Sequence, residues 1–330
     1  MSTYSSLALV TSVVFYLLAL FAHAAEWASA RRTAEVSTAD ERELVTVGAG
    51  GDGARPASSQ PATSRPPDPE QPGSARLEMY GRLGVVLTGM GLVLAVTGVV
   101  LRGLAAQRAP WGNMYEFITS AMVFVVAAYL VLVAVWGMRW LGLLVTGLAA
   151  VGNGLAVTVF YVDVGPLVPA LHSVWFIIHI VAAALSGAAF NIGGLASILY
   201  LVKRRRDGRA GGPGAAVPAP SYLDRLPSSR TLDMIAYRFH AFAFPLWTFT
   251  VTAGAIWAEY AWGRFWGWDP KETWALVTWV IYACYLHARA TAGWRGSGAA
   301  VIAIIGLVSF WFNFIGVNLL FSGFHSYAGI

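Results

Sequence analysis

Eight apolar segments, each long enough to cross a lipid bilayer, constrain the fold of this chain more than any other feature. They occupy residues 7–25, 81–101, 115–136, 140–161, 174–202, 239–258, 273–290 and 299–321. An α-helix needs about 20 residues to span a bilayer core of about 30 Å. Hydrophobic residues make up 57% of the chain and charged residues only 12%, too few to cover the surface of a soluble protein. The sequence therefore predicts an all-α, polytopic membrane protein with eight transmembrane helices.

The basic residues between these segments predict the orientation of the chain. Of the 22 Lys and Arg residues, 18 lie on one side, in segments 26–82, 137–139, 203–238 and 289–298. The other side holds only Arg102, Arg108, Arg264 and Lys271. Because basic loops stay in the cytoplasm, we expect a cytoplasmic (plasma) membrane protein with both termini on the outer side. We expect no nucleic-acid binding, since the basic residues flank apolar spans and do not form a basic domain.

Composition divides the chain into three parts. Residues 1–25 are predicted to form a first transmembrane helix, which no positive charge precedes as it would in a cleaved signal peptide. Residues 26–79 are predicted to be a disordered cytoplasmic linker, because 48–75 are rich in Gly, Pro, Ala and Ser. Residues 80–330 form the predicted seven-span core. The single cysteine, Cys284, excludes an internal disulfide and CxxC chemistry.

The most informative outer segment is Trp257–Trp274, WAEYAWGRFWGWDPKETW, which we call the Trp segment. It contains Trp257, Trp262, Trp266, Trp268 and Trp274. An aromatic belt at the bilayer interface explains two or three of these residues, but not five of them interleaved with glycine. The pattern favours a surface for a flat aromatic ligand. Asp269 and Pro270 suit the cap and the first turn of the next helix.

The segment WGRFWGWDPKETW resembles the "WWD" signature of the haem-handling proteins of cytochrome c maturation. The eight-span layout resembles the CcsA (ResC) family of the System II pathway in particular. The likeness continues in PWGNMYEF, SVWFIIH, TWALVTWVIYACYLHAR and FSGFHSYA, and it covers most of the chain from about residue 80 onward. The first span and residues 26–79 contribute little to it.

This resemblance implies a function. Such a protein moves haem b across the cytoplasmic membrane and presents it at the outer face to the CxxCH motif of apocytochrome c. It works with a ResB-type membrane partner as a component of a cytochrome c haem lyase, a holocytochrome c synthase. We expect no catalytic residue in this chain, because its sequence shows no nucleophile or acid–base pair for further chemistry.

Histidines are the expected iron ligands. His179 and His325 come from the outer ends of different helices near the Trp segment, and the resemblance points to the same pair. The resemblance matches His287 to the family's transmembrane histidine, which implies an inner haem whose second ligand comes from the partner. An interfacial position without ligation is the alternative for each. His172, His240 and His23 lack such support.

Other residues are expected to hold the ring. We assign Trp262, Trp266 and Trp268 to contact with the macrocycle. Asp269 belongs to the same binding segment, where it caps the following helix. Arg264 and Lys271 are both candidates for the haem propionates, because a guanidinium or an ammonium binds carboxylate.

Two other functional classes compete with this interpretation. A haem-b electron-transfer subunit that oxidises quinol uses pairs of histidines within the spans, whereas only His287 is clearly intramembrane here. An ion-coupled transporter would need charged residues at mid-membrane, but Glu116, Asp163 and Glu259 fall near outer ends.

Overall fold

The computed structural model describes residues 1–48, 72–210, 221–224, 226–291 and 293–325. Within these ranges the chain is helical and contains no strand, which confirms the all-α prediction. The α-helices are α1 (Ser2–Gly48), α2 (Pro72–Ala106), α3 (Met114–Trp136), α4 (Gly142–Thr158), α5 (Val174–Ala210), α6 (Ser229–Trp262), α7 (Pro270–Thr291), α8 (Ser297–Trp311) and α9 (Val317–Leu320). Short 3-10 helices lie at Arg139–Leu141, Pro169–Leu171 and Tyr222–Asp224.

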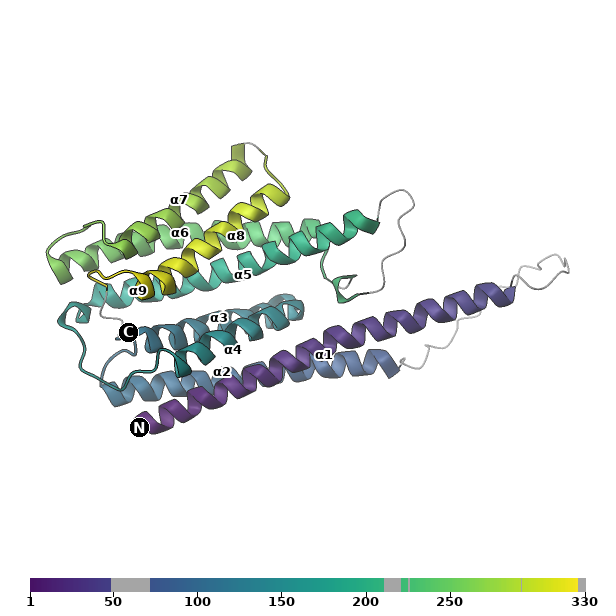
Figure 1. The fold of residues 1–330 in the computed structure, drawn as a ribbon, viewed down its shortest axis with the longest axis horizontal. Coiled ribbons are helices and arrows are strands. Elements are labelled where there is room, and N and C mark those ends of the chain that lie inside the picture. Colours follow the sequence, from purple (N-terminus) through teal and green to yellow (C-terminus); the bar gives the residue numbers. More distant parts are fainter. Residues whose placement is uncertain (49–71, 211–220, 225, 292, 326–330) are drawn as a thin grey trace.

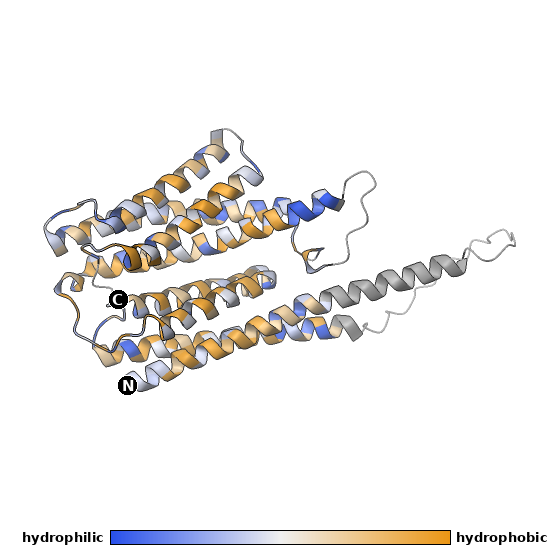
Figure 2. Ribbon diagram, in the orientation of Figure 1, coloured by the Kyte–Doolittle hydropathy of each residue, from blue (hydrophilic) through white to orange (hydrophobic). Residues whose placement is uncertain are grey.

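The long helices run side by side and alternate in direction (Figure 1). Helices α1–α4 form one group and α5–α9 the other, with α3 packed against α5 where the groups meet. The start of α1 and the loops 107–113, 159–173, 263–269 and 321–325 gather at one end, which we call the aromatic end. The opposite end carries Lys203–Arg206, blue in Figure 2, and is called the basic end. This arrangement matches the alternation of loops that the sequence predicts.

The number of membrane-spanning helices differs from the prediction. Among the described residues, seven helices are long and apolar enough to cross a membrane, and the last of them, Ser297–Leu320, joins α8 to α9. Helix α7, which contains the predicted span 273–290, is not among the seven. Its 22 residues include Lys271, Glu272 and Arg289 together with many Trp, Tyr and Thr, so its hydropathy is low. It nevertheless packs beside α6 and α8, and the chain is a multi-pass membrane protein.

The boundaries of the predicted linker are also corrected. Helix α1 continues to Gly48 and α2 begins at Pro72, so residues 26–48 and 72–79 are helical. The physical reason is composition, because Ala, Glu and Arg, which favour helix, are frequent in 26–44. The Gly- and Pro-rich middle of the linker, residues 49–71, lies outside the described residues.

Helix α8 does not pass directly into α9. Residues Phe312–Gly316 form a π-helix between them. A π-helical turn contains more residues than an α-helical turn, and such turns are frequent at functional sites. This one adjoins the cavity described next, to which Asn313 and Phe314 contribute.

Candidate functional site

A cavity at the aromatic end brings several predicted site residues together. Its walls come from α3, α5, α6, α7, the end of α8 and the loops beside them. Its volume is about 170 Å³, counted as space for the centres of water molecules. One water needs about 10–15 Å³ by that measure, so the cavity has room for an organic ligand. The predicted residues that line it are His179, His325, Trp262, Trp266 and Lys271.

His179 enters this cavity from the second turn of α5 and is oriented by α6. Its Nδ1 lies 2.9 Å from the carbonyl oxygen of Thr250. A carbonyl only accepts, so Nδ1 carries the hydrogen and Nε2 keeps its lone pair. The ring stacks on Trp257 at 5.9 Å between centroids. A Cβ at Gly254 would lie 2.8 Å from the imidazole, so the glycine allows this close approach.

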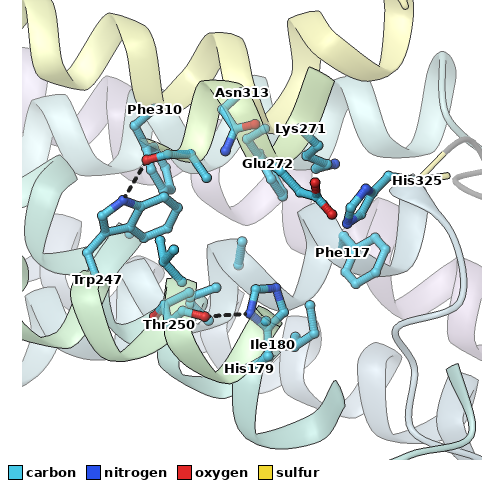
Figure 3. Close-up of a pocket in the computed structure, with 18 of the residues that line it drawn as sticks. Phe117, His179, Ile180, Trp247, Thr250, Lys271, Glu272, Phe310, Asn313 and His325 are labelled. Atoms are coloured by element: carbon cyan, nitrogen blue, oxygen red, sulfur yellow. Dashed lines mark hydrogen bonds between the residues drawn. The ribbon is translucent and has the colours of Figure 1, made fainter. Parts of the chain in front are cut away.

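His325 reaches the same space from the loop after α9 (Figure 3). Its Nδ1 lies 2.9 Å from Oδ1 of Asp269, whose side chain is 2% exposed. The other carboxylate oxygen of Asp269 accepts the backbone N–H of Phe324 at 2.7 Å. Metal-binding histidines usually have their second ring nitrogen held in this way by a carboxylate or a carbonyl. Both imidazoles at this cavity therefore have Nδ1 held by an oxygen atom.

The start of α7 explains how Asp269 is positioned. Asp269 caps the helix and accepts the backbone N–H of Lys271 at 3.0 Å, in the capping role that the sequence indicates. Glu272 reaches back to the N–H groups of Asp269 at 3.1 Å and Gly267 at 2.8 Å. This reciprocal pattern is a capping box, with Pro270 in the first turn. The Asp-Pro-Lys-Glu run thus fixes both the helix and the residue that holds His325.

The protonation of the Asp269–His325 pair suits ligation. Burial lowers the pKa of His325, and the hydrogen bond to Asp269 offsets this only in part. Burial alone would raise the pKa of Asp269, but the hydrogen bond from His325 and two backbone N–H groups lower it overall. At neutral pH the pair is therefore a neutral imidazole that donates to an ionised carboxylate.

Two basic residues lie at this site in different settings. Lys271 lines the cavity and donates from Nζ to Oδ1 of Asn318 at 2.9 Å. Burial lowers the pKa of Lys271 to about 8. Arg264 does not line the cavity, but it pairs with Glu272 at 3.3 Å and lies over the Phe324 ring at 4.5 Å. Its Nη2 is buried and has no acceptor among the described residues.

Two predicted residues lie apart from the cavity. Trp268 is 69% exposed, packs edge-on against Trp266 at 5.8 Å and has a positive φ of 58°. His287 is exposed near the basic end of α7. His172, which the sequence does not support as a ligand, is exposed in the loop just before α5.

Sequence reasoning missed some residues of the site. Trp257 is 2% exposed, donates to the carbonyl oxygen of Ala170 at 2.8 Å and contacts both imidazoles. Its place in the Trp segment was the available signal. Trp111 also lines the cavity, and the Trp-Gly pair before α3 repeats the Trp-Gly pair before α7.

His240, which the sequence does not support as a ligand, lies inside the bundle. It is fully buried, and its ring is in contact with the rings of Phe190, Tyr282 and Tyr285.

Comparison with known proteins identifies the family. The model of the cytochrome c assembly protein family matches residues 86–325. The cytochrome c biogenesis protein CcsA of Mesostigma viride is 34% identical over 267 residues, covering 76% of this chain and 87% of that protein. The CcsA protein of Microcystis aeruginosa is 35% identical over 287 residues, covering 75% and 87%.

A solved structure shares the fold. The cytochrome c haem lyase CcmF superposes with a TM-score of 0.55 at 12% identity, covering 99% of this chain. The chain spans only 52% of the length of CcmF, and at this identity the likeness concerns the fold alone. From the family match and the two relatives, we conclude that the chain belongs to the CcsA family of cytochrome c biogenesis proteins.

Proposed function

We propose that this chain binds haem b between His179 and His325 at the outer face of the cytoplasmic membrane and presents it to apocytochrome c. One observation carries the proposal: two imidazoles from distant elements, each with its Nδ1 held by another residue, line one aromatic cavity. The family match supports a role in cytochrome c biogenesis.

The residues around the cavity fit this ligand. Trp257, Trp262 and Trp266 offer flat apolar surfaces to a macrocycle. Lys271 offers positive charge to its carboxylates from the cavity wall, while Arg264 lies outside the lining, paired with Glu272. No group of three or more His, Cys, Asp or Glu among the described residues could hold a bare metal ion. Two imidazoles without further ligands suit an iron that a porphyrin already holds at its equator.

In this proposal the chain positions the ligand and does no covalent chemistry. Bound haem supplies the vinyl groups to which the two thiols of a CxxCH motif add. His179 and His325 fix the iron, and the aromatic walls exclude water and set the orientation of the ring. Orientation of this kind converts an encounter between two molecules into a reaction within one complex.

The proposal extends to the basic end and to a partner. His287 is exposed on α7, and Cys284, about one turn earlier on the same helix, is exposed as well. A ResB-type membrane partner would cover this face and supply the second ligand of an inner haem. The two proteins together would form the holocytochrome c synthase, with the basic end in the cytoplasm.

The competing role, an electron-transfer subunit that oxidises quinol, needs pairs of histidines facing each other within the spans. The fully buried histidine of α6, His240, instead lies against Phe190, Tyr282 and Tyr285. The structure therefore favours the outer site over a stacked-haem bundle.

The test is the absorption spectrum of the full chain purified with its partner, with and without reductant. We expect sharp low-spin haem bands in the parent and their weakening in His179→Ala and His325→Ala. His172→Ala is the matched control, because His172 is exposed in the loop before α5 and should be silent. A parent without low-spin bands, or variants with the parent's spectrum, would contradict the outer site.

A further inference from the structure

Two segments at the aromatic end share one construction. They are Arg108–Glu116 (RAPWGNMYE) and Arg264–Glu272 (RFWGWDPKE). In each, an Arg is followed eight residues later by a Glu in the first turn of a helix, α3 or α7. Between them lie a Trp-Gly pair and the helix cap. We call Arg108, Gly112 and Glu116 the first clasp, and Arg264, Gly267 and Glu272 the second clasp.

The first clasp is fully formed. Glu116 is 0% exposed and accepts from Nη1 of Arg108 at 2.7 Å and from the backbone N–H of Gly112 at 2.7 Å. Arg102 adds a third donor at 2.9 Å. Asn113 caps α3 by accepting the backbone N–H of Glu116 at 3.0 Å.

The second clasp shares the main contacts of the first. Glu272 pairs with Arg264 and accepts the N–H of Gly267, which is one residue further from its Glu than Gly112 is, while Asp269 caps the helix by accepting the N–H of Lys271. In both clasps a Cβ on the glycine would collide with the guanidinium of the arginine. The glycine lets the guanidinium lie directly against the backbone of the loop.

A tryptophan of each segment lies next to the clasp glycine and lines the cavity. Trp111 precedes Gly112 and Trp266 precedes Gly267, and both line the cavity wall. Trp111 also packs in the cluster that contains Trp257 and Trp262. Its Nε1 is buried and has no acceptor among the described residues. A buried donor without an acceptor is unfavourable, so this N–H is suited to an acceptor that arrives with a ligand.

We propose that the first clasp is a second ligand-holding element, in which Trp111 contacts the macrocycle and donates its indole N–H to a ligand carboxylate. The inference rests on the proposed haem function and adds to it a contact from α3. The charge nearby is favourable, because Arg102 and Arg108 share the single carboxylate of Glu116. The first clasp therefore keeps a net positive charge, which favours an anionic ligand group.

The alternative is that the first clasp only caps α3. In that case Trp111 is a packing residue, and its replacement affects folding without affecting how fast haem leaves. The two possibilities are distinguished by measuring the rate of haem release from protein that is fully inserted in the membrane.

The experiment uses the full chain purified with its partner, and it measures the rate of haem transfer to excess apomyoglobin. Trp111→Phe keeps a flat face and removes the N–H, and we expect transfer about tenfold faster. Trp111→Ala removes both and should be faster still. Trp136→Ala is the control, since Trp136 is 64% exposed at the basic end and should leave the rate unchanged.

The outcomes are distinct. Transfer at the parent's rate in Trp111→Phe overturns the hydrogen bond, and the parent's rate in both Trp111 variants overturns the contact. If His325→Ala also releases haem at the parent's rate, the outer site itself is wrong and the proposed function fails first. A Glu116 variant is not a suitable test, because it leaves two buried guanidinium groups without their carboxylate and risks misfolding. The variants Trp111→Phe and Trp111→Ala therefore decide the question.

Discussion

The histidines at the two ends of the molecule lie in opposite settings. At the aromatic end, His179 and His325 have their Nδ1 atoms bound to Thr250 and Asp269, and both face a cavity. Near the basic end, His287 is exposed on the surface of α7. In the proposed function, this difference makes the aromatic end a two-histidine site and leaves His287 as one histidine of a site that the partner would complete. Each prediction below tests that asymmetry.

The largest effects are expected from removing the histidines. His179→Ala or His325→Ala should abolish holocytochrome c formation, because each removes an axial ligand from the outer site. Haem-stained c-type cytochrome in cells is the measurement, with immunoblots to show that the variants are inserted.

Loss of His287 should be equally severe but for another reason. We expect His287→Ala to deplete haem at both positions, because the outer position is filled from the inner one, whereas His325→Ala should leave the inner haem in place. Haem content of each variant, purified with the partner, distinguishes the two. Equal outer loading in His287→Ala and the parent would contradict a relay.

A smaller effect is expected when His325 is kept and its orienting carboxylate is changed. Asp269→Asn removes the negative charge opposite Nδ1 while keeping the size of the side chain. Loss of such a partner costs about 10- to 100-fold in metal affinity. Haem titration measures it, and Asp163→Asn, an exposed carboxylate in the loop before α5, serves as control. Unchanged affinity would show that Asp269 acts only as a helix cap.

The setting of His179 can be tested in the same way, by changing a residue of α6 that contacts its ring. Gly254→Ala places a Cβ 2.8 Å from the imidazole, so we expect the ring to shift and haem affinity to fall by roughly tenfold. Alanine stabilises a helix by about 1 kcal/mol relative to glycine, so a loss of haem affinity would not result from destabilisation of α6. Gly154→Ala is the matched control, because nothing lies within 4 Å of its Cβ position. The same loss in both variants would argue against a specific contact.

The smallest effect is expected from mild acid. An imidazole must be neutral to bind iron, and the pKa of His325 lies below its ordinary value of 6.5. Protonation therefore competes with ligation only below pH 6.5, and the outer haem should stay bound between pH 8 and 6.5. The Soret absorbance of the purified complex follows this directly. Release that begins above pH 6.5 would mean that His325 is not the buried, neutral ligand.

Much of the fold could be predicted from the sequence, because long apolar runs have few alternatives. The difference in the number of spans arises at α7, where a helix long enough for a bilayer is built largely from aromatic and hydroxyl residues. The error in the linker arose because the composition of 48–75 was extended to 26–79, although the flanking residues favour helix.

The site was predictable only in part, since its contacts join distant elements. The placement of His179 and His325 at one cavity follows the prediction, although ligation by them remains a proposal. The sequence does not indicate the roles of Thr250 and Gly254. Thr250 acts through its backbone carbonyl, and Gly254 acts through its lack of a side chain. Trp268, which shares the signature with Trp266, has a positive φ and is exposed outside the cavity lining, and the signature does not indicate this difference.

The π-helix at Phe312–Gly316 sets the direction in which the chain leaves the bundle. Each residue of an α-helix turns the chain by about 100°, and a π-helical turn contains one residue more than an α-helical turn. Helix α9 is therefore rotated by about that angle relative to an uninterrupted helix. A single extra residue thus sets the direction in which α9 and the start of the loop 321–325 leave the bundle, and deleting one residue from 312–316 would turn that segment by the same angle with almost no change in composition.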